Sequence, residues 1–348
     1  MKVSDLKYLV AYLIPIFGIM CCLNPEAYFW LVPAFAFVAL PLMETILPVN
    51  KLNHTSEEEP SRLSNKFFDL LLYINFPLII AIVYLSITRF PTAELTTLQL
   101  VSAIFSSGIV LGSAGINVAH EIGHRDNAFD HWYARLMFSL SLYMHFHIEH
   151  NLGHHKNVAT KEDPATAQKG DWLYVFWFKS VIGAYLHAWA IENRLVRNAK
   201  GTIWHPSNRM IQFHLFQGAM LFAIYFFLGQ TALIYFVIIA LISVLLLETI
   251  NYIEHYGLLR QKMDNGRYEP VKPRHSWNSD HIMGRIFLYE LTRHSDHHFK
   301  ANRKYQVLRS IEESPQLPLG YPGSLVLALF PPLWFSVMDK RLAAFNEA

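Results

Sequence analysis

Six apolar runs that contain no lysine or arginine constrain the fold of this chain more than any other feature. They cover residues 8–23, 28–47, 67–88, 98–119, 210–228 and 232–253. Most approach or exceed the roughly 20 residues that a helix needs to cross the apolar core of a bilayer. Because lipid offers no partner to backbone polar groups, such runs cross as helices. The sequence therefore predicts an all-α integral membrane protein with six transmembrane helices.

The composition agrees with a membrane protein. Hydrophobic residues make up 53% of the 348 residues and charged residues 16%, against roughly 25% charged in a soluble domain. The apolar residues are concentrated in the six runs, so we expect a single membrane-bound domain over residues 1–348. The first run, preceded by Lys2 and Lys7, also allows a cleaved signal peptide. Cleavage would leave the topology of the later runs unchanged.

The basic residues indicate which ends of the predicted spans face the cytoplasm. Three short connections, near residues 24–27, 90–97 and 229–231, share one side, and of the 29 Lys and Arg residues only Arg89 lies near them. Cytoplasmic loops carry the excess of Lys and Arg in membrane proteins. Residues 120–209 and 254–348 are therefore expected to form a helical cytoplasmic cap.

Within this cap, three segments have a recognisable pattern. Residues 131–149 are typical of a helix, and the aromatic-rich residues 171–192 predict a helix that lies at the level of the lipid headgroups. Residues 260–274 contain Gly266 and two prolines and should form a loop.

Nine of the eighteen histidines fall in four tight groups, each just after an apolar run or well outside one. The groups are HEIGH (His120, His124), HNLGHH (His150, His154, His155), EHYG (His255) and RHSDHH (His294, His297, His298). Imidazole is a good ligand for iron, zinc and copper, and nine imidazoles are about twice what one ion can hold. The sequence therefore predicts two metal ions at the water face of the membrane.

The spacing suggests how these histidines divide. His120 and His124 are four residues apart, as are His150 and His154, so each pair should project from one helix face and bind one ion. His155 is rotated by about 100° from its neighbour in a helix and is expected to serve the other ion or to bridge. The set at 294, 297 and 298 repeats this arrangement. The last histidine, His255, should lie at the depth of His120.

The other nine histidines receive a structural interpretation. His147 is the best reserve ligand, because it lies three residues before His150. The rest are either near a histidine group or isolated from one: His131, His145, His275 and His281 are near, whereas His54, His187, His205 and His214 lie in loops or at helix ends.

Several other classes of protein fit less well. HEIGH satisfies the HExxH pattern of zinc proteases, with Glu121 as the general base, but such a site uses three ligands and leaves most of the histidines unexplained. A metal transporter needs polar residues through its spans, and these spans hold few. Cys21 and Cys22 are adjacent, which suits packing rather than a metal site, and the chain has no GxGxxG dinucleotide fingerprint. Any electrons that it uses must therefore come from another protein.

The amino-acid sequence around the histidines resembles that of a known family. The segments NVAHEIGHR, IEHNLGHHKNVATKEDPAT, NYIEHYGLLRQKMDNGRYE, HSWNSDH and LTRHSDHHFKANRKYQ look like those of the membrane-bound alkane 1-monooxygenases, which belong to the class of histidine-box fatty-acid desaturases and hydroxylases. The three histidine boxes are common to the whole class, whereas NYIEHYG is typical of the alkane hydroxylases within it. The resemblance extends over residues 40–339.

This resemblance implies a function. It implies terminal hydroxylation of medium-chain n-alkanes with O2 at a non-haem di-iron centre, which is itself the catalytic group. Electrons would come from rubredoxin and its NAD(P)H-dependent reductase, and the enzyme would lie in a bacterial inner membrane with its histidines on the cytoplasmic side. A fatty-acyl desaturase or hydroxylase remains the alternative. No nucleic-acid partner is implied.

Two further sets of residues are candidates for supporting roles. Five carboxylates lie next to or near the histidine groups and are candidates to accept imidazole N–H groups: Glu121, Glu149, Asp163, Glu254 and Asp296. Gly108, Gly112 and Gly115 share one face of the fourth span, and either line a substrate tunnel or allow close helix packing.

The sequence also suggests where an electron carrier would dock. Residues 254–309 contain eleven Lys and Arg residues and six acidic ones. A positive surface there would attract an acidic carrier, as rubredoxins typically are, although the positive-inside tendency alone accounts for the charge equally well. Arg260, Lys300 and Arg303 are the candidate contacts.

Overall fold

The computed structural model describes residues 2–347, and these form helices and turns without a β-strand. The helices of the first third are α1 (Leu13–Leu23), α2 (Pro25–Tyr28), α3 (Leu31–Ala34), α4 (Leu40–Ile46), α5 (Glu59–Leu63), α6 (Lys66–Tyr73), α7 (Asn75–Arg89), α8 (Thr97–Val110) and α9 (Asn117–Gly123). The remaining helices are α10 (Ala128–Ser139), α11 (Phe146–Glu149), α12 (His155–Asn157), α13 (Leu173–Lys200), α14 (Arg209–His255), α15 (Ile282–Phe287), α16 (His294–Phe299), α17 (Tyr321–Ala328) and α18 (Pro331–Glu347). The all-α prediction is confirmed.

Five helical stretches are long and apolar enough to cross a membrane. They are Val3–Leu23, Pro25–Ile46, Glu59–Thr92, Thr97–Gly123 and Arg209–His255. The first four contain most or all of the first four predicted runs. The fourth stretch is 83% buried over its most apolar window, whereas the second is 17% buried, so the fourth lies at the centre of the bundle and the second at its edge. Cys21 and Cys22 are buried in the core.

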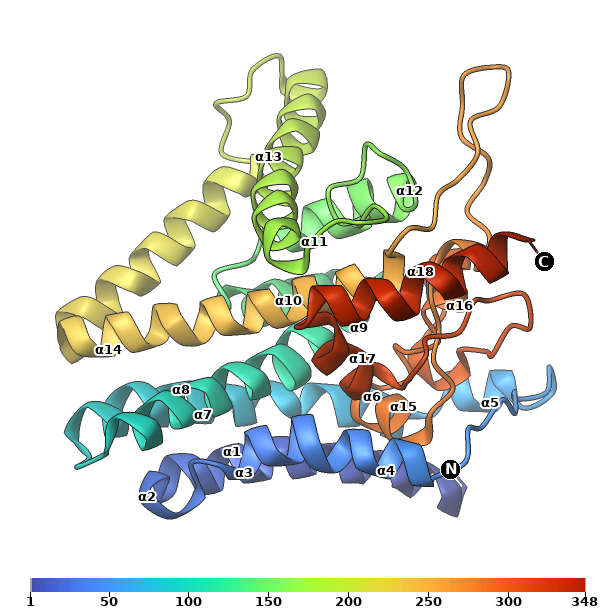
Figure 1. Cartoon of the computed structure of the whole chain (residues 1–348). Helices are drawn as coiled ribbons and strands as arrows, with labels where there is room; N and C mark the ends of the chain where they lie inside the picture. The colour runs from blue at the N-terminus through green and yellow to red at the C-terminus, as the bar shows by residue number, and fades with distance from the viewer. Residues whose placement is uncertain (1, 348) are drawn as a thin grey trace.

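The fifth stretch, α14, contains both of the last two predicted runs. Its backbone is non-helical at Gly229, where φ is 86° and ψ is 175°. This region of conformational space is essentially restricted to glycine. In Figure 1 the two halves of α14 meet at the left of the view and run in different directions. The predicted fifth and sixth spans are therefore two halves of one broken helix.

The cap differs from the prediction at one place. The predicted helix over residues 131–149 is wrong as a single helix, because the chain leaves α10 after Ser139 and resumes as α11 at Phe146. Leu142 takes a left-handed backbone conformation with φ 54°, and the Tyr143 N–H donates back to the Phe138 carbonyl at 3.1 Å. This tight turn redirects the chain before the second histidine group, which periodicity alone could not reveal.

Two other segments of the cap have the predicted local structure, apart from their ends. The helix predicted over residues 171–192 begins at Leu173 as α13, continues to Lys200 and ends where Gly201 adopts φ 75°. In Figure 1, α13 crosses the direction of the long helices; its position at the level of the lipid headgroups stays a prediction. Of the loop predicted over residues 260–274, residues 260–272 form a projecting loop whose only ladder contact among the described residues joins Lys262 to Tyr268, and a 3-10 helix begins at Pro273.

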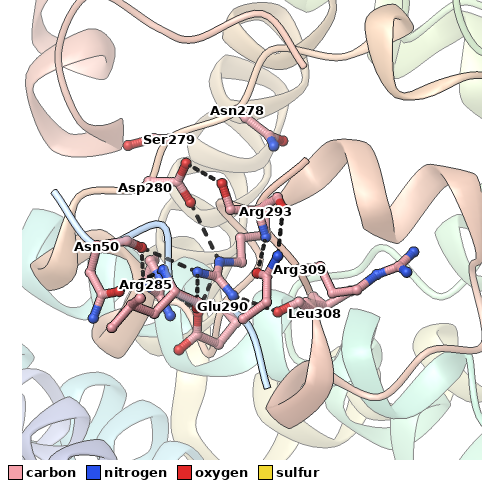
Figure 2. Close-up of polar contacts among 12 residues, drawn as sticks. Asn50, Asn278, Ser279, Asp280, Arg285, Glu290, Arg293, Leu308 and Arg309 are labelled. Carbon is pink, nitrogen blue, oxygen red and sulfur yellow. Dashed lines mark hydrogen bonds and ion pairs between the residues drawn. The ribbon is translucent and has the colours of Figure 1, made fainter. Parts of the chain in front are cut away.

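A buried ion cluster supports the segment that leads into α16 (Figure 2). The Glu290 carboxylate accepts hydrogen bonds from Arg285 Nε and from the Tyr8 hydroxyl, both at 2.5 Å, and Lys7 lies 3.4 Å away. Arg293, which directly precedes His294, donates to the carbonyl of Leu308 at 2.7 Å. Contacts from two distant parts of the chain, residues 7–8 and Leu308, thereby fix the start of the last histidine group.

This cluster also holds a strained backbone. Tyr289 and Glu290 both have positive φ, at 49° and 59°, a conformation that costs of the order of 1 kcal/mol or more for each non-glycine residue. The ion pairs of the Glu290 side chain oppose this cost. Burial alone would raise the pKa of Glu290, but the charge of Arg285, followed by those of Lys7 and Arg293, lowers the pKa to about 2.

We predict that the Glu290 ion cluster makes stability depend on pH. A carboxyl whose folded-state pKa lies below its ordinary value of 4.5 stabilises the fold above that value and loses its contribution as the pH falls towards 2. The effect should be about 3 kcal/mol. Glu290→Gln should therefore lower the free energy of unfolding at pH 7, and the gap to the wild type should narrow below about pH 4.5.

The measurement is denaturant unfolding in detergent, followed by circular dichroism at several pH values. The exposed Glu313 offers a matched control, and Glu313→Gln should leave stability unchanged. A gap between Glu290→Gln and wild type that stays constant from pH 7 to pH 3 would contradict the prediction.

Candidate metal centre

The structure brings all nine clustered histidines together in two adjoining groups. The first, the five-histidine group, consists of His120, His124, His150, His155 and His297. The second, the four-histidine group, consists of His154, His255, His294 and His298. Within each group the candidate ligand nitrogens all lie within 4.8 Å of one another. Each group can therefore hold one metal ion.

Four parts of the fold deliver these side chains. The end of α9 carries His120 and His124, and the last residue of α14 is His255. A π-helical turn, His150–His154, follows α11. The short helix α16 carries the remaining three histidines. Because α9 ends the long apolar stretch Thr97–Gly123 and α14 is itself long and apolar, their ends place the site at the boundary of the apolar bundle.

The π-helical turn changes the predicted pairing. In this turn the His155 N–H donates to the His150 carbonyl, an i to i+5 register. His155 consequently joins His150, with 3.0 Å between their Nε2 atoms, while His154 contacts His298 at 3.2 Å. The prediction that His150 and His154 share one ion is thus contradicted, although the pair at His120 and His124 does stay in one group, at 3.1 Å.

The groups adjoin through α16. His297 belongs to the five-histidine group, whereas His294 and His298 belong to the other. The rings of His155 and His298, one from each group, stack with centroids 4.4 Å apart. Two metal ions held here would therefore be near neighbours.

The chemistry of these nitrogens fits bound metal ions. His120 Nε2 lies 2.6 Å from His150 Nε2, and one proton at most can lie between two such atoms. Both ring nitrogens of His297 are buried without a hydrogen-bond partner. Burial lowers the pKa of His150, His155 and His298 well below the ordinary value. Neutral imidazoles with converging lone pairs are the form that binds a transition metal.

Two of the five candidate carboxylates contact a histidine of the site. Asp163 accepts from His154 Nδ1 at 2.9 Å. Burial opposes ionisation of Asp163, but the charge of His154 and this hydrogen bond outweigh it, and the pKa of Asp163 is lowered. Glu254 places Oε2 3.2 Å from His294 Nε2 and accepts a hydrogen bond from the Tyr321 hydroxyl at 2.8 Å. Both contacts belong to the four-histidine group.

The other three carboxylates have different partners. Glu121 accepts the backbone N–H of Tyr305 at 3.1 Å, so it braces the site rather than facing a metal as a protease base would. Glu149 pairs with His187 at 3.0 Å. The third, Asp296, holds Arg309 at 2.7 Å. His187, Tyr305 and Tyr321, the partners of Glu149, Glu121 and Glu254, are far from these carboxylates in the sequence. No local sequence pattern could have identified them.

The reserve ligand lies outside both groups. His147 Nε2 pairs with His131 Nδ1 at 3.0 Å. The side chains of His275 and His281 contact Glu269 and Ser279 respectively.

A small cavity lies beneath the histidines. Its walls include His120, His150 and His294, together with Phe146 and Gly112. Most of its surface is apolar, and the histidines occupy one end. An apolar group could therefore approach the metal positions from within the bundle.

Two comparisons identify relatives of this chain. The family model of the fatty acid desaturases matches residues 95–323, which include all nine clustered histidines. An alkane 1-monooxygenase of Alcanivorax borkumensis is 38% identical over 303 residues, 87% of this chain and 75% of that protein. Alkane 1-monooxygenases of Ectopseudomonas oleovorans and Pseudomonas putida are 36% and 37% identical, each over 90% of this chain and 78% of the relative.

Proposed function

Because this chain belongs to the alkane 1-monooxygenases within the fatty acid desaturase family, we propose that it hydroxylates the terminal methyl group of medium-chain n-alkanes. The balanced reaction converts R–CH3, O2, two electrons and two protons into R–CH2OH and water. The convergence of nine imidazoles above an apolar cavity is the observation that carries this proposal.

The metals are proposed to be two iron ions, one in each histidine group. Imidazole nitrogens suit iron, and an open redox metal is what O2 chemistry requires. When bound, the iron ions supply the activation of O2. The protein supplies the converging imidazoles, orients His154 through Asp163, and presents the substrate from an apolar cavity. Each of the nine histidines is proposed as a ligand.

A series of apolar cavities gives the alkane a route from the bilayer. The outermost has a volume of about 420 Å³ and is lined by residues of α8, α14 and α17. It shares Phe37, Ile109 and Leu246 with a second cavity, and the second shares Ile250 with the cavity beneath the histidines. An alkane dissolved in the membrane would thus reach the metals without crossing water, chain end first.

The three candidate tunnel glycines divide between the two roles left open by the sequence. A Cβ at Gly108 would lie 2.4 Å from Ile242 Cγ2, so this glycine allows α8 to pack against α14. Gly115 faces Leu111 and Ile79, which also indicates packing. Gly112 lies close to Leu246 and lines the cavity beneath the histidines. We assign the tunnel wall to Gly112 alone.

The proposed topology has six crossings, with the two halves of α14 as the last two, in a bacterial inner membrane. The distribution of Lys and Arg supports a cytoplasmic position for the histidine end, since only Arg89 lies near the opposite end. The chain would form one domain, consisting of the bundle and its cap.

The electron donor is proposed to be rubredoxin, supplied by its reductase and docked on the cap. The side-chain contacts of the candidate residues show which of them are free to bind a carrier. Arg303 pairs with Glu59 at 3.0 Å, and Arg260 donates to the Glu269 carbonyl at 2.6 Å, so both have internal partners. Lys300 and Lys156 are exposed and directly follow ligand-bearing segments. They are therefore better placed to attract an acidic carrier.

Desaturation is the second candidate, because the matched family model is that of fatty acid desaturases. Incubation of the purified enzyme with linear alkanes, O2 and a rubredoxin system decides between the two. Primary alcohols as the main product support the proposal, whereas alkenes or internal alcohols would overturn it.

A first prediction concerns the metal. The purified protein should contain close to two iron ions per chain by mass spectrometry of the metals, with little zinc. His297→Ala and His255→Ala, one from each group, should each reduce the iron content and abolish turnover. His147→Ala is the matched control and should retain iron, since His147 faces His131. Full iron content in His255→Ala would remove His255 from the ligand set.

A second prediction concerns the tunnel. Leu246 lines both outer cavities, so Leu246→Trp should narrow the route and shift the preferred substrate to shorter alkanes, with iron content unchanged. Ile234→Trp, at a 46% exposed position of the same helix, is the control and should leave chain-length preference unchanged. Competition assays with alkanes of several lengths measure the effect. An unchanged preference in Leu246→Trp would exclude this route.

A third prediction concerns the carrier. Lys156→Glu and Lys300→Glu should each raise the KM for rubredoxin several-fold, and rising salt should weaken wild-type turnover because it screens the attraction. Lys200→Glu reverses an exposed charge at the end of α13 and should have no effect. Turnover that is insensitive both to these reversals and to salt would disprove electrostatic docking here.

A further inference from the structure

A second apolar groove lies on the other side of α14 from the substrate route. Its volume is about 340 Å³, and it is formed by the turn after α10, by α13 and by α14. From α14 it is lined by residues 237, 240, 241 and 244, whereas the outer substrate cavity is lined by 242, 245, 246 and 249. At 3.6 residues per turn these two sets point in directions roughly 140° apart. The groove is therefore separate from the proposed alkane route.

One end of this groove carries a buried histidine with a free nitrogen. His145 is 8% exposed, and its Nε2 atom has no hydrogen-bond partner. Its ring lies between those of Tyr143 and Tyr185, with centroids 4.4 Å and 5.3 Å away. Burial lowers the pKa of His145 to about 3, so the imidazole is neutral at pH 7. A neutral imidazole can accept a hydrogen bond at one ring nitrogen and donate at the other.

The other polar side chains of the groove have partners. Ser141 accepts from Ser243 at 3.0 Å, Tyr143 donates to Glu248 at 2.8 Å, and Tyr185 pairs with His214 at 2.9 Å. His145 Nε2 is thus the one buried side-chain atom lining this groove, among the described residues, that lacks a partner. Such an atom is costly unless a ligand or water satisfies it.

The shape of the groove indicates the rest of the ligand. From Val244, near the histidine end, the lining runs to Val237, about 10 Å along α14 towards the middle of the bundle. Val181, Ile182 and Leu241 line it between α13 and α14. No Lys or Arg occurs among the described lining residues, so the groove offers no cation to a carboxylate or a phosphate. It suits an unbranched chain with one uncharged polar end.

We propose that this groove binds the primary alcohol produced by the reaction, with the alcohol hydroxyl hydrogen-bonded to His145 Nε2 and the alkyl chain along α14. The identity of this ligand as the product rests on the proposed function. A hydroxyl suits either tautomer of the imidazole, since it can donate or accept. The parent alkane has no group that could satisfy His145.

The groove also adjoins the cavity where the alcohol would form. Tyr143 lines the groove and Phe146 lines the cavity beneath the histidines, and their rings stack with centroids 5.7 Å apart. A polar path runs beside these rings: Asn251, which lines the cavity, donates to Glu248 at 3.1 Å, and Glu248 accepts from Tyr143. Movement of two rings would let the alcohol pass to the groove and leave the alkane route free for the next substrate.

The test uses the iron-loaded full chain in lipid nanodiscs, without reductant so that no turnover occurs. The probe is 1-dodecanol with a diazirine in its chain, and mass spectrometry locates the photolabel. We expect saturable labelling within residues 181–185 and 237–244, displaced by 1-dodecanol but not by dodecane, dodecanoate or added phospholipid. Labelling displaced by phospholipid and not by dodecanol would assign the groove to membrane lipid and overturn the proposal.

Variants separate the hydrogen bond from the groove. His145→Phe should reduce saturable labelling about tenfold, as expected for loss of one buried hydrogen bond. Val237→Trp should block the apolar end, whereas Ile238→Trp, on the same helix at a 38% exposed position outside the groove, should label as wild type. Undiminished labelling in both His145→Phe and Val237→Trp would disprove the site.

The outcomes also distinguish this inference from the proposed function. An enzyme that makes primary alcohols from alkanes but shows no saturable labelling in the groove would refute the inference and leave the function intact. Saturable, His145-dependent labelling in a protein that fails to hydroxylate alkanes would refute the function and its assignment of the alcohol as product.

Discussion

The convergence of nine imidazoles at one depth is the constraint on which the rest of this structure depends. Imidazole rings whose Nε2 atoms lie 2.6 to 3.2 Å apart cannot satisfy one another by hydrogen bonds alone, and a metal ion is what stabilises such an arrangement. The fold brings the histidines together by placing most of them at the ends of helices or on short helical turns. His120 and His255 lie at the ends of the long apolar stretches Thr97–Gly123 and Arg209–His255, and others lie on a turn and on a short helix whose start is held by contacts with Tyr8 and Leu308.

The features that the sequence could predict are those set by local physics. Hydropathy located the apolar runs, because the requirement of a bilayer for about 20 apolar residues acts on contiguous chain. The i, i+4 rule placed His120 and His124 together, since that segment is a regular helix. The same rule failed at His150 and His154, where a π-helical turn shifts the register by one residue. A π turn is stabilised by its surroundings, and composition does not reveal it.

Other features depended on contacts between distant residues. Glu254 contacts Tyr321, and Glu149 contacts His187. These residues are far apart in the sequence, so no local pattern predicts the contacts. The turn at Leu142, which breaks the expected helix, moves His145 to the wall of a groove rather than to the metal site. The histidine groups could thus be predicted as a set, whereas their division, their supporting carboxylates and the second groove required the fold.

The division of the carboxylates makes the two proposed metal positions unequal. Asp163 and Glu254 both contact the four-histidine group, and no carboxylate among the described residues forms an ion pair with a histidine of the five-histidine group. Asp163 lies at His154 Nδ1, the nitrogen that faces away from His298, and a carboxylate in that place makes an imidazole a stronger donor to a cation. Glu254 lies instead at His294 Nε2, the nitrogen that also faces His255. An ion in the four-histidine group would therefore lie near the carboxylate of Asp163, whereas no carboxylate of the described residues pairs with a histidine of the five-histidine group. The two ions should accordingly differ in affinity and in the ease with which they are oxidised, with the four-histidine position favouring the higher charge.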